Sequence, residues 1–510
     1  MKHGMRRAFA MLLAAVMAAV MAVGMVPTAA AAGGAAGYPE DTEHTKAALA
    51  QGDDLKDQYT HKDELFTMDM VHNNPALQPY TSNYTNSEFL AQRNFDGHVF
   101  FLYDCAQYGL LWDEFDKAKG KTGDDKVFPE GSEDRAWVEA KKASIKKKYQ
   151  QAVEAKVGVY FMMDIIVLPT RLVERYPEIL TDGKLDITKK ETQEVMDYMF
   201  KEMFTEYPEI DGIYFRFGET YTGKQYGAPY HSGNNPILYK KDKEDAKNRH
   251  MTLIKYLGDK LYGDKMVDKK PRDMIYRTWG FSGFQNDPIE YLSISEEIPT
   301  NDHLYFCIKH STGDFHRTVP FNQTIGIGKH QQIVEVQAAR EYEGKGAYPN
   351  YIADGVINGF EEYEWQMDSE IQNTCLRDVI NTQEHPQIKG IWTWSRGGGW
   401  NGPYINGVNG IVGDHTSDNQ EVVIKDGSEM WNDLNTYVVT QWAKDTSKTD
   451  KYYAKEYAKR YLGMDEADAE NFYRLCILSS RAVLLGRARD TESYGVDTWW
   501  TRDQNINPKK

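Results

Sequence analysis

Eight apolar, β-rich segments recur along this chain, and amphipathic helical patterns separate several of them. The segments span residues 64–71, 98–105, 157–164, 211–217, 274–280, 303–310, 332–339 and 390–394. Runs this apolar are typical of a parallel sheet whose two faces are both covered by crossover helices. Eight such units predict a (β/α)8 barrel. A doubly wound open sheet is the alternative, but neither GxGxxG nor GxxxxGK stands at a predicted strand–helix turn.

The predicted fold class is therefore α/β, a (β/α)8 TIM barrel with a small helical C-terminal domain. Residues 1–32 combine basic residues, an apolar stretch and small residues, which is typical of a cleaved signal peptide. Residues 33–60 are predicted to be a linker, 61–400 the barrel, and 401–510 a loop followed by helices. An uncleaved membrane anchor is the alternative for the first segment. We expect a secreted, extracellular protein without membrane contact after cleavage.

Composition narrows the partners and the chemistry. The formal net charge of −16 argues against nucleic acid and anionic membranes as partners. Aromatic residues make up 13% of the chain, which suits a surface that stacks on sugar rings, although most of them are expected in the core. The four cysteines form no CxxC pair, so buried free thiols are expected rather than a disulfide framework or a zinc site. We expect no metal and no cofactor, and the sequence leaves the oligomeric state open.

Three carboxylic acids, Glu219, Asp314 and Glu341, each follow a different predicted strand. In a parallel barrel the C-terminal strand ends meet at one mouth, where side chains from several strands converge on substrate. A carboxyl group that is partly desolvated among aromatic rings can keep its proton near neutral pH and act as a general acid, which is the role we expect for Glu219. A second, ionised carboxylate can attack the sugar or activate water. The pattern predicts hydrolysis of a glycosidic bond.

Further side chains are predicted at the same rim. The cations Arg216, Arg277 and Lys309 either form structural ion pairs or hold the carboxylate of an anionic sugar through charge-assisted hydrogen bonds. Asp164 either binds substrate or caps a loop. The indoles of Trp279 and Trp394 are candidates to stack on a sugar ring. The expected substrate-binding residues are Arg216, Arg277, Lys309, Asp164, Trp279 and Trp394. Glu335 lies within a predicted strand and is expected inside the barrel, paired with a cation.

Several segments resemble the family-67 glycoside hydrolases, the α-glucuronidases. They are the acid-bearing run 211–219, the run Tyr276-Arg-Thr-Trp279, the motif that contains Lys309 and Asp314, the run 335–344 that contains Glu341, and the helical tail from Trp431. The resemblance is patchy over about residues 60–490, and the family's N-terminal β-sandwich has no counterpart here.

The resemblance implies roles for the residues that match. Glu219 would be the general acid, and Asp314 and Glu341 would share the activation of water in an inverting mechanism. Arg216, Arg277 and Lys309 would bind the uronate carboxylate, with Arg216 standing where the family has lysine. The implied substrate is an oligosaccharide or polysaccharide that carries a uronic acid.

Two other functions stay open from the sequence. A retaining hexosaminidase-type barrel would use the substrate's own acetamido group, but that chemistry usually places an acidic residue directly before the acid, where this chain has Gly218. A barrel that binds carbohydrate without cleaving it is the non-enzymatic alternative.

Overall fold

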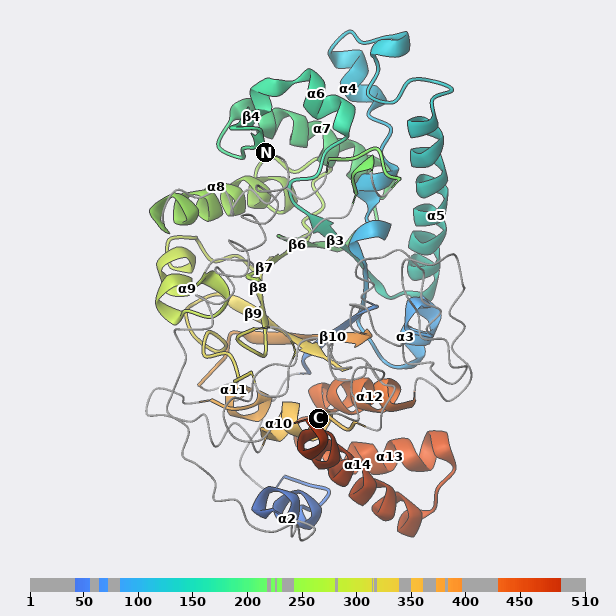
Figure 1. Ribbon diagram of the computed structural model, residues 1–510, viewed down its shortest axis with the longest axis vertical. Helices are drawn as coiled ribbons and strands as arrows, with labels where there is room; N and C mark the ends of the chain where they lie inside the picture. The colour runs from blue at the N-terminus through green and yellow to red at the C-terminus, as the bar shows by residue number, and fades with distance from the viewer. Residues whose placement is uncertain are drawn as a thin grey trace, which may run out of the picture.

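The structure is a computed structural model of the 510-residue chain, seen end-on in Figure 1. It describes residues 42–55, 64–71, 83–217, 222–224, 227–231, 243–279, 283–313, 315, 319–338, 350–360, 373–380, 384–396 and 430–487.

Eight parallel strands form a closed barrel (Figure 1). Their order around the barrel is β1-β10-β9-β8-β7-β6-β3-β2, so neighbours in the wall follow one another in the sequence and β10 pairs with β1 to close it. The predicted (β/α)8 fold is confirmed. The strands are β1 (Phe66–Val71), β2 (Gly97–Phe100), β3 (Gly158–Asp164), β6 (Gly212–Arg216), β7 (Asp273–Arg277), β8 (Leu304–Lys309), β9 (Gln331–Gln337) and β10 (Ile388–Arg396).

Helices connect and surround the strands. After β8, the described part of the connection to β9 contains turns and no helix. α12 packs outside β10 and β1, where the eighth helix of such a barrel lies. The helices between successive strands, with α12 after the last, are α3 (Ser87–Gln92), α4 (Asp113–Ala118), α5 (Glu133–Ala155), α6 (Thr170–Arg175), α7 (Lys190–Glu206), α8 (Lys243–Leu261), α9 (Pro288–Ser295), α10 (Ala353–Asn358), α11 (Leu376–Val379) and α12 (Met430–Lys444).

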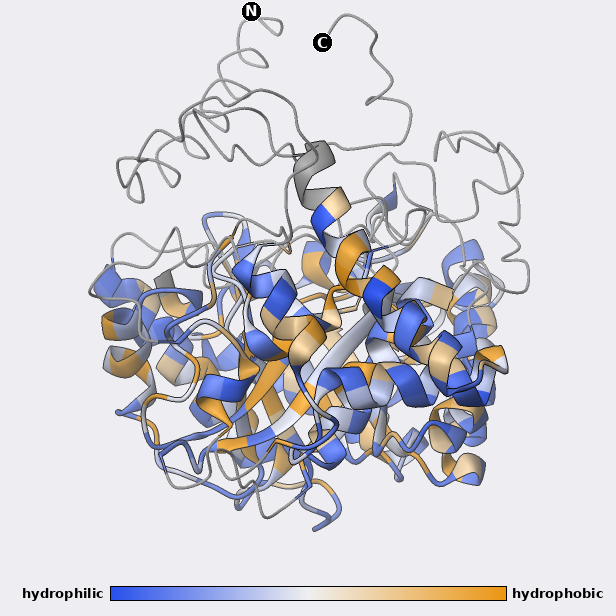
Figure 2. Cartoon of the chain, turned by 90° about the horizontal axis from the view of Figure 1, so that it is seen from below, coloured by the Kyte–Doolittle hydropathy of each residue, from blue (hydrophilic) through white to orange (hydrophobic). Residues whose placement is uncertain are grey.

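Local sequence sets where these helices begin and end. Asp287 caps α9 by accepting hydrogen bonds from the backbone N–H groups of Ile289 and Glu290, and Pro288 occupies the first turn, where its missing N–H costs nothing. Ser132 caps α5 in the same way. Figure 2 shows that the helices carry both hydrophilic and hydrophobic residues, as amphipathic helices between a core and solvent should.

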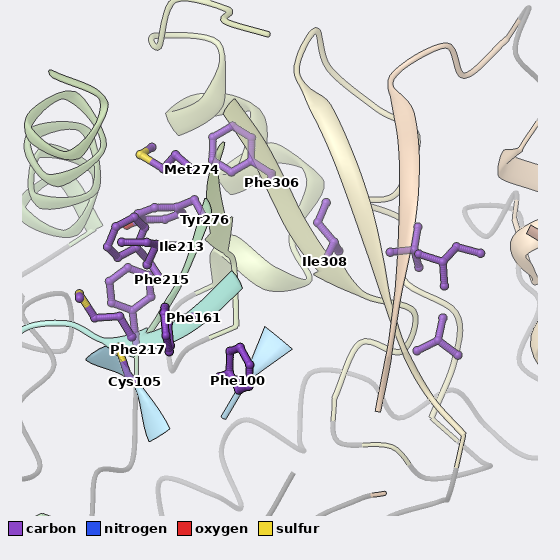
Figure 3. Close-up of a cluster of buried hydrophobic side chains, with 14 of the residues drawn as sticks. Phe100, Cys105, Phe161, Ile213, Phe215, Phe217, Met274, Tyr276, Phe306 and Ile308 are labelled. Atoms are coloured by element: carbon purple, nitrogen blue, oxygen red, sulfur yellow. The ribbon is translucent and has the colours of Figure 1, made fainter. Parts of the chain in front are cut away.

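The main hydrophobic core lies between the strands and the surrounding helices. Alternate residues of the strands point outward into it, because successive side chains of a strand face opposite sides. Each large apolar side chain that becomes fully buried stabilises the fold by about 1.5–3 kcal/mol. Figure 3 shows part of this layer, with Phe100, Cys105, Phe161, Ile213, Phe215, Phe217, Met274, Tyr276, Phe306 and Ile308 labelled.

A second, smaller cluster fills the barrel interior, so the barrel is packed rather than hollow at its base. Tyr160 lies there among three glycines, and a Cβ atom at Gly97, Gly158 or Gly212 would come within 2.9 Å of its ring. Its hydroxyl group donates to Asp273 over 3.1 Å. The glycines therefore provide the volume that the tyrosine occupies at the N-terminal end of the barrel.

Two further helices, α13 (Asp450–Leu462) and α14 (Glu466–Arg487), pack beside α12, and α2 (Glu43–Ala50) lies against α14 (Figure 1). The helical C-terminal region is thus present as predicted. The fully buried Asp450 joins these parts, because it accepts hydrogen bonds from Gln51 and Tyr473. Burial raises the pKa of Asp450 to about 6.

Most predicted strand positions agree with the structure, with differences at the edges. The expected strand 98–105 ends at Phe100, and a short 3-10 helix, Leu102–Asp104, follows it. The two-residue strands β4 (Leu180–Thr181) and β5 (Lys184–Leu185) form a hairpin that was not predicted. The proposed domain boundaries and the signal peptide stay predictions, and residues 1–32 lie outside the described part of the chain.

The four cysteines are buried and free, as expected. Within the described ranges, no helix has the length and apolarity needed to cross a membrane.

Candidate functional site

The C-terminal mouth of the barrel gathers the charged residues that were predicted from the sequence. Tyr214, Ile275, Cys307 and Ile333 face the barrel interior on four successive strands. Side chains two positions further along each strand face the same way and lie nearer the C-terminal end. Those side chains belong to Arg216, Arg277, Lys309 and Glu335, all of them buried.

Arg277 and Glu335 form a fully buried ion pair across β8. Arg277 Nε lies 2.6 Å from Glu335 Oε2, and Nη2 lies 2.7 Å from Oε1. The two side chains are 2% and 0% exposed. Glu335 is therefore inside the barrel and paired with a cation, as predicted, whereas the binding role expected for Arg277 stays a prediction.

Cys307 lies on β8 between the strands that carry this pair, with its Sγ 3.9 Å from Glu335 Oε2. Burial, and after it the negative charge of Glu335, raises the pKa of the Cys307 thiol well above its ordinary value. The thiol is neutral at physiological pH, so it is a packing residue rather than a nucleophile.

Lys309 is held among aromatic rings. Its Nζ atom lies 3.7 Å from the ring centroid of Trp279, 4.5 Å from that of Phe315 and 5.6 Å from that of Trp394. Arg277 reaches two of the same rings, with its Cζ atom 5.4 Å from Trp394 and 5.9 Å from Trp279. A cation over an aromatic face is stabilised by the ring quadrupole. The two predicted indoles therefore line a cationic part of the mouth, and Phe315 is an addition that the sequence did not indicate.

Asp164 and Arg216 form a second buried pair at the ends of β3 and β6. Arg216 Nη1 donates to both carboxylate oxygens of Asp164 over 2.9 and 3.0 Å. The carboxylate of Asp164 therefore engages the neighbouring strand β6. Both side chains lie at the mouth, and their roles toward substrate stay predictions.

A third buried carboxylate, Asp69, lies on the outer face of the barrel wall and was not predicted. It accepts from Thr393 Oγ1 over 2.7 Å, and from the backbone N–H and the Oγ of Ser395 over 3.0 and 2.8 Å. Burial raises its pKa to about 7 despite these donors. Asp69 thereby ties β1 to the mouth end of β10. An acidic residue in the middle of an otherwise apolar strand is the sequence signal that could have found it.

The three expected catalytic residues, Glu219, Asp314 and Glu341, lie outside the described residues. Their described sequence neighbours include Phe217, which follows the end of β6, and Phe315, which packs edge-on against Trp394 with ring centroids 5.4 Å apart.

Among the described side chains, no group of three or more His, Cys, Asp or Glu residues could hold a metal ion. The expectation that the protein needs no metal or cofactor stays a prediction.

Comparisons with known proteins add a likeness of fold. No protein-family model and no curated protein matches the chain. Among solved structures, the chain is similar to a GH138 enzyme targeting pectin rhamnogalacturonan II, with a TM-score of 0.45 and 12% identity over 84% of this chain and 44% of that one. It is also similar to an O-GlcNAc hydrolase from Thermobaculum terrenum (TM-score 0.35, 10% identity, 79% and 64% covered).

A glycoside hydrolase family 5 enzyme from Prevotella bryantii B14 is a third such structure, with a TM-score of 0.31 and 10% identity over 66% of this chain and 92% of that one. The chain spans less than half of the GH138 enzyme's length. At identities of 10–12%, these structures share with the chain a likeness of fold alone.

Proposed function

We propose that this protein is a secreted glycoside hydrolase that cleaves a glycosidic bond of a uronic-acid-bearing glycan, in the manner of an α-glucuronidase. The observation that carries the proposal is the cationic, aromatic mouth of the barrel. Lys309 lies within 6 Å of the centroids of Trp279 and Trp394, and Arg277 lies within 6 Å of the same two rings. Aromatic faces suit a sugar ring, and the cations suit its carboxylate.

Three cations gather at this mouth. Asp164 and Glu335 each pair with one arginine, Arg216 and Arg277 respectively. Lys309 brings a third cation to an indole that Arg277 also approaches. Cations in this arrangement suit the carboxylate of an anionic sugar.

The proposed chemistry is the one that the sequence predicts. Glu219 protonates the leaving oxygen, and Asp314 and Glu341 activate water on the other side of the anomeric carbon. All three follow strands whose C-terminal ends lie at this mouth. No cofactor takes part in this mechanism, and the signal-like residues 1–32 support secretion.

Paired substrates test the proposal. We expect faster cleavage of a uronide than of the matching neutral glycoside, in one of the two anomers, because only the uronide carries a carboxylate for the cations. The assay compares kcat/KM for 4-nitrophenyl α- and β-D-glucuronides with that for the corresponding D-glucosides. A consistent preference for the neutral sugars would contradict the role assigned to Lys309 and Arg277.

A further inference from the structure

We infer that Glu335 is a positioning residue: it holds Arg277 by one edge of the guanidinium and leaves the other edge available for the carboxylate of the substrate. This inference rests on the proposed function, because it assigns a second contact to the same anionic group. It concerns a residue that is fully buried and therefore need not touch the sugar itself.

The geometry of the pair separates the two edges of the guanidinium. An arginine side chain has five N–H donors in a rigid plane, one on Nε and two on each Nη. Glu335 accepts from Nε and Nη2, which form the lateral edge of the group. Nη1 and the second N–H of Nη2 form the end of the fork, and among the described residues no acceptor contacts Nη1. That end has the spacing that a second carboxylate requires.

Two short hydrogen bonds fix the plane of the guanidinium, and burial strengthens them. Arg277 is 2% exposed and Glu335 is 0% exposed, so water screens the pair very little. The carboxylate also cancels one of the two positive charges that Arg277 and Lys309 bring to the same pair of indoles. Without Glu335, two buried cations would lie near each other with less compensation, and Arg277 would lose its fixed orientation.

The location of Arg277 makes its remaining edge useful. Trp279 and Trp394 flank both Arg277 and Lys309. A carboxylate has about four lone-pair sites, so one uronate group can accept from a lysine and from an arginine fork together. A change in the orientation of the Arg277 guanidinium should therefore weaken binding of the anionic sugar and leave binding of the neutral sugar largely unchanged.

The experiment compares binding of D-glucuronate and D-glucose to the full-length mature protein by isothermal titration, together with the kcat and KM of the matching 4-nitrophenyl glycosides. Glu335→Gln keeps the volume of the side chain, but its amide N–H2 opposes one arginine donor. We expect the Kd for glucuronate and the KM for the glucuronide to rise about tenfold, the size of one lost charge-assisted hydrogen bond. The constants for the neutral sugars should change less than twofold. In an Arg277→Met background, Glu335→Gln should have no further effect on the ratio of the constants for the uronide to those for the neutral sugar.

A matched control is available in the pair Arg249–Asp186, which is buried between α8 and the loop after β5, with Nη1 2.9 Å from Oδ1. Asp186→Asn breaks a comparable ion pair outside the barrel, and it should leave the ratio of uronide to neutral constants unchanged. If Glu335→Gln does not fold, Glu335→Asp keeps the charge, shortens the reach to Arg277, and should raise the Kd for glucuronate in the same direction.

The outcomes distinguish the inference from the proposed function. Equal changes for charged and neutral ligands in Glu335→Gln, or an unchanged Kd for glucuronate, would overturn the positioning role while the wild-type preference for glucuronate stands. A wild-type protein that binds glucuronate no better than glucose would overturn both. A selective loss for glucuronate that disappears in the Arg277→Met background supports the inference.

Discussion

Arg216 and Asp164 are register partners on β6 and β3, and Arg216 Nη1 lies 2.9 Å from Oδ1 and 3.0 Å from Oδ2 of the carboxylate. Asp164 is 2% exposed and Arg216 is 9% exposed at the side chain. The pair thus joins two neighbouring strands where they reach the mouth. It parallels the pair of Arg277 and Glu335 further around the same rim.

Removing one partner of the Asp164–Arg216 pair should be costly. Asp164→Asn removes a negative charge that directly contacts the buried arginine, and we expect a loss of about 3–5 kcal/mol in the free energy of unfolding. The double variant Asp164→Leu/Arg216→Met should recover much of that loss, because neither charge is then buried alone. Urea unfolding of the single and double variants measures both effects. A double variant no more stable than Asp164→Asn would show that the ion pair is not the source of the loss.

Lys309→Met tests the cation among the three rings. Methionine fills similar space against Trp279 and Phe315, so the protein should stay folded, while the charge that attracts a uronate is lost. We expect the Kd for D-glucuronate to rise tenfold or more, with little change for D-glucose, as measured by titration calorimetry. Lys265→Met, at an exposed lysine beyond α8, is the control and should bind both sugars like the wild type. An unchanged Kd for glucuronate in Lys309→Met would remove this lysine from the anion site.

Asp69 should make stability depend on pH. Burial raises its pKa to about 7 in the folded protein, whereas the ordinary value is 3.8. The folded state therefore binds more protons than the unfolded state between about pH 4 and pH 7. The resulting stability is complete below pH 4 and is lost as the pH rises through 7, by an amount on the order of 4 kcal/mol. Asp69→Asn should reduce the dependence of the free energy of unfolding on pH between about pH 4 and pH 7.

Urea unfolding at a series of pH values measures how steeply the free energy of unfolding changes with pH. Other buried acids contribute to the wild-type slope with the same sign as Asp69, since burial also raises the pKa of Glu202 to about 7 and that of Asp450 to about 6. Glu133→Gln, at an exposed position on α5, should leave the profile unchanged. A slope as steep in Asp69→Asn as in the wild type would contradict the assignment.

The contact between α2 and the C-terminal helices should also be measurable. Gln51 Nε2 donates to Asp450 Oδ1 over 2.8 Å and contacts the hydroxyl oxygen of Tyr473 over 2.6 Å. Gln51→Leu removes these bonds and leaves the buried carboxylate with fewer donors, which should lower the free energy of unfolding by about 1–3 kcal/mol. Gln193→Leu on α7, whose amide donates to a backbone carbonyl away from this network, is a comparison that should leave α2 attached. Limited proteolysis before residue 55 should become faster only in Gln51→Leu.

The fold could be predicted because the strands are continuous apolar runs and the helices carry apolar residues at regular helical spacing. Two of the amphipathic patterns between the predicted strands correspond to α7 (Lys190–Glu206) and α8 (Lys243–Leu261). The β4–β5 hairpin was missed because two-residue strands carry no periodicity. The end of β2 was placed too late because the apolar run continues into a 3-10 helix.

The site could be predicted only in part, because the side chains at the mouth come from distant positions. Alternation along a strand places Arg277 and Glu335 inside the barrel, but it does not say that they meet across β8, 58 residues apart in sequence. Arg216 was expected at the rim, in an ion pair or as a ligand of an anionic sugar, but the sequence did not indicate Asp164 as its partner. The contact between the ring of Phe315 and Lys309 depends on the path of the loop after β8. The sequence of that loop has no regular spacing of apolar residues from which its path could be predicted.

The most direct test of the central claim is the cleavage of a uronic-acid-bearing xylo-oligosaccharide by the wild type and by Glu219→Gln. A sugar leaving group is strongly basic and needs a proton, whereas 4-nitrophenolate does not, so loss of a general acid is expected to affect the oligosaccharide much more than the aryl uronide. We predict that Glu219→Gln lowers kcat on the oligosaccharide by about 100-fold or more and binds glucuronate like the wild type. Equal rates for the two proteins on the oligosaccharide, or no release of uronic acid by the wild type, would contradict the account.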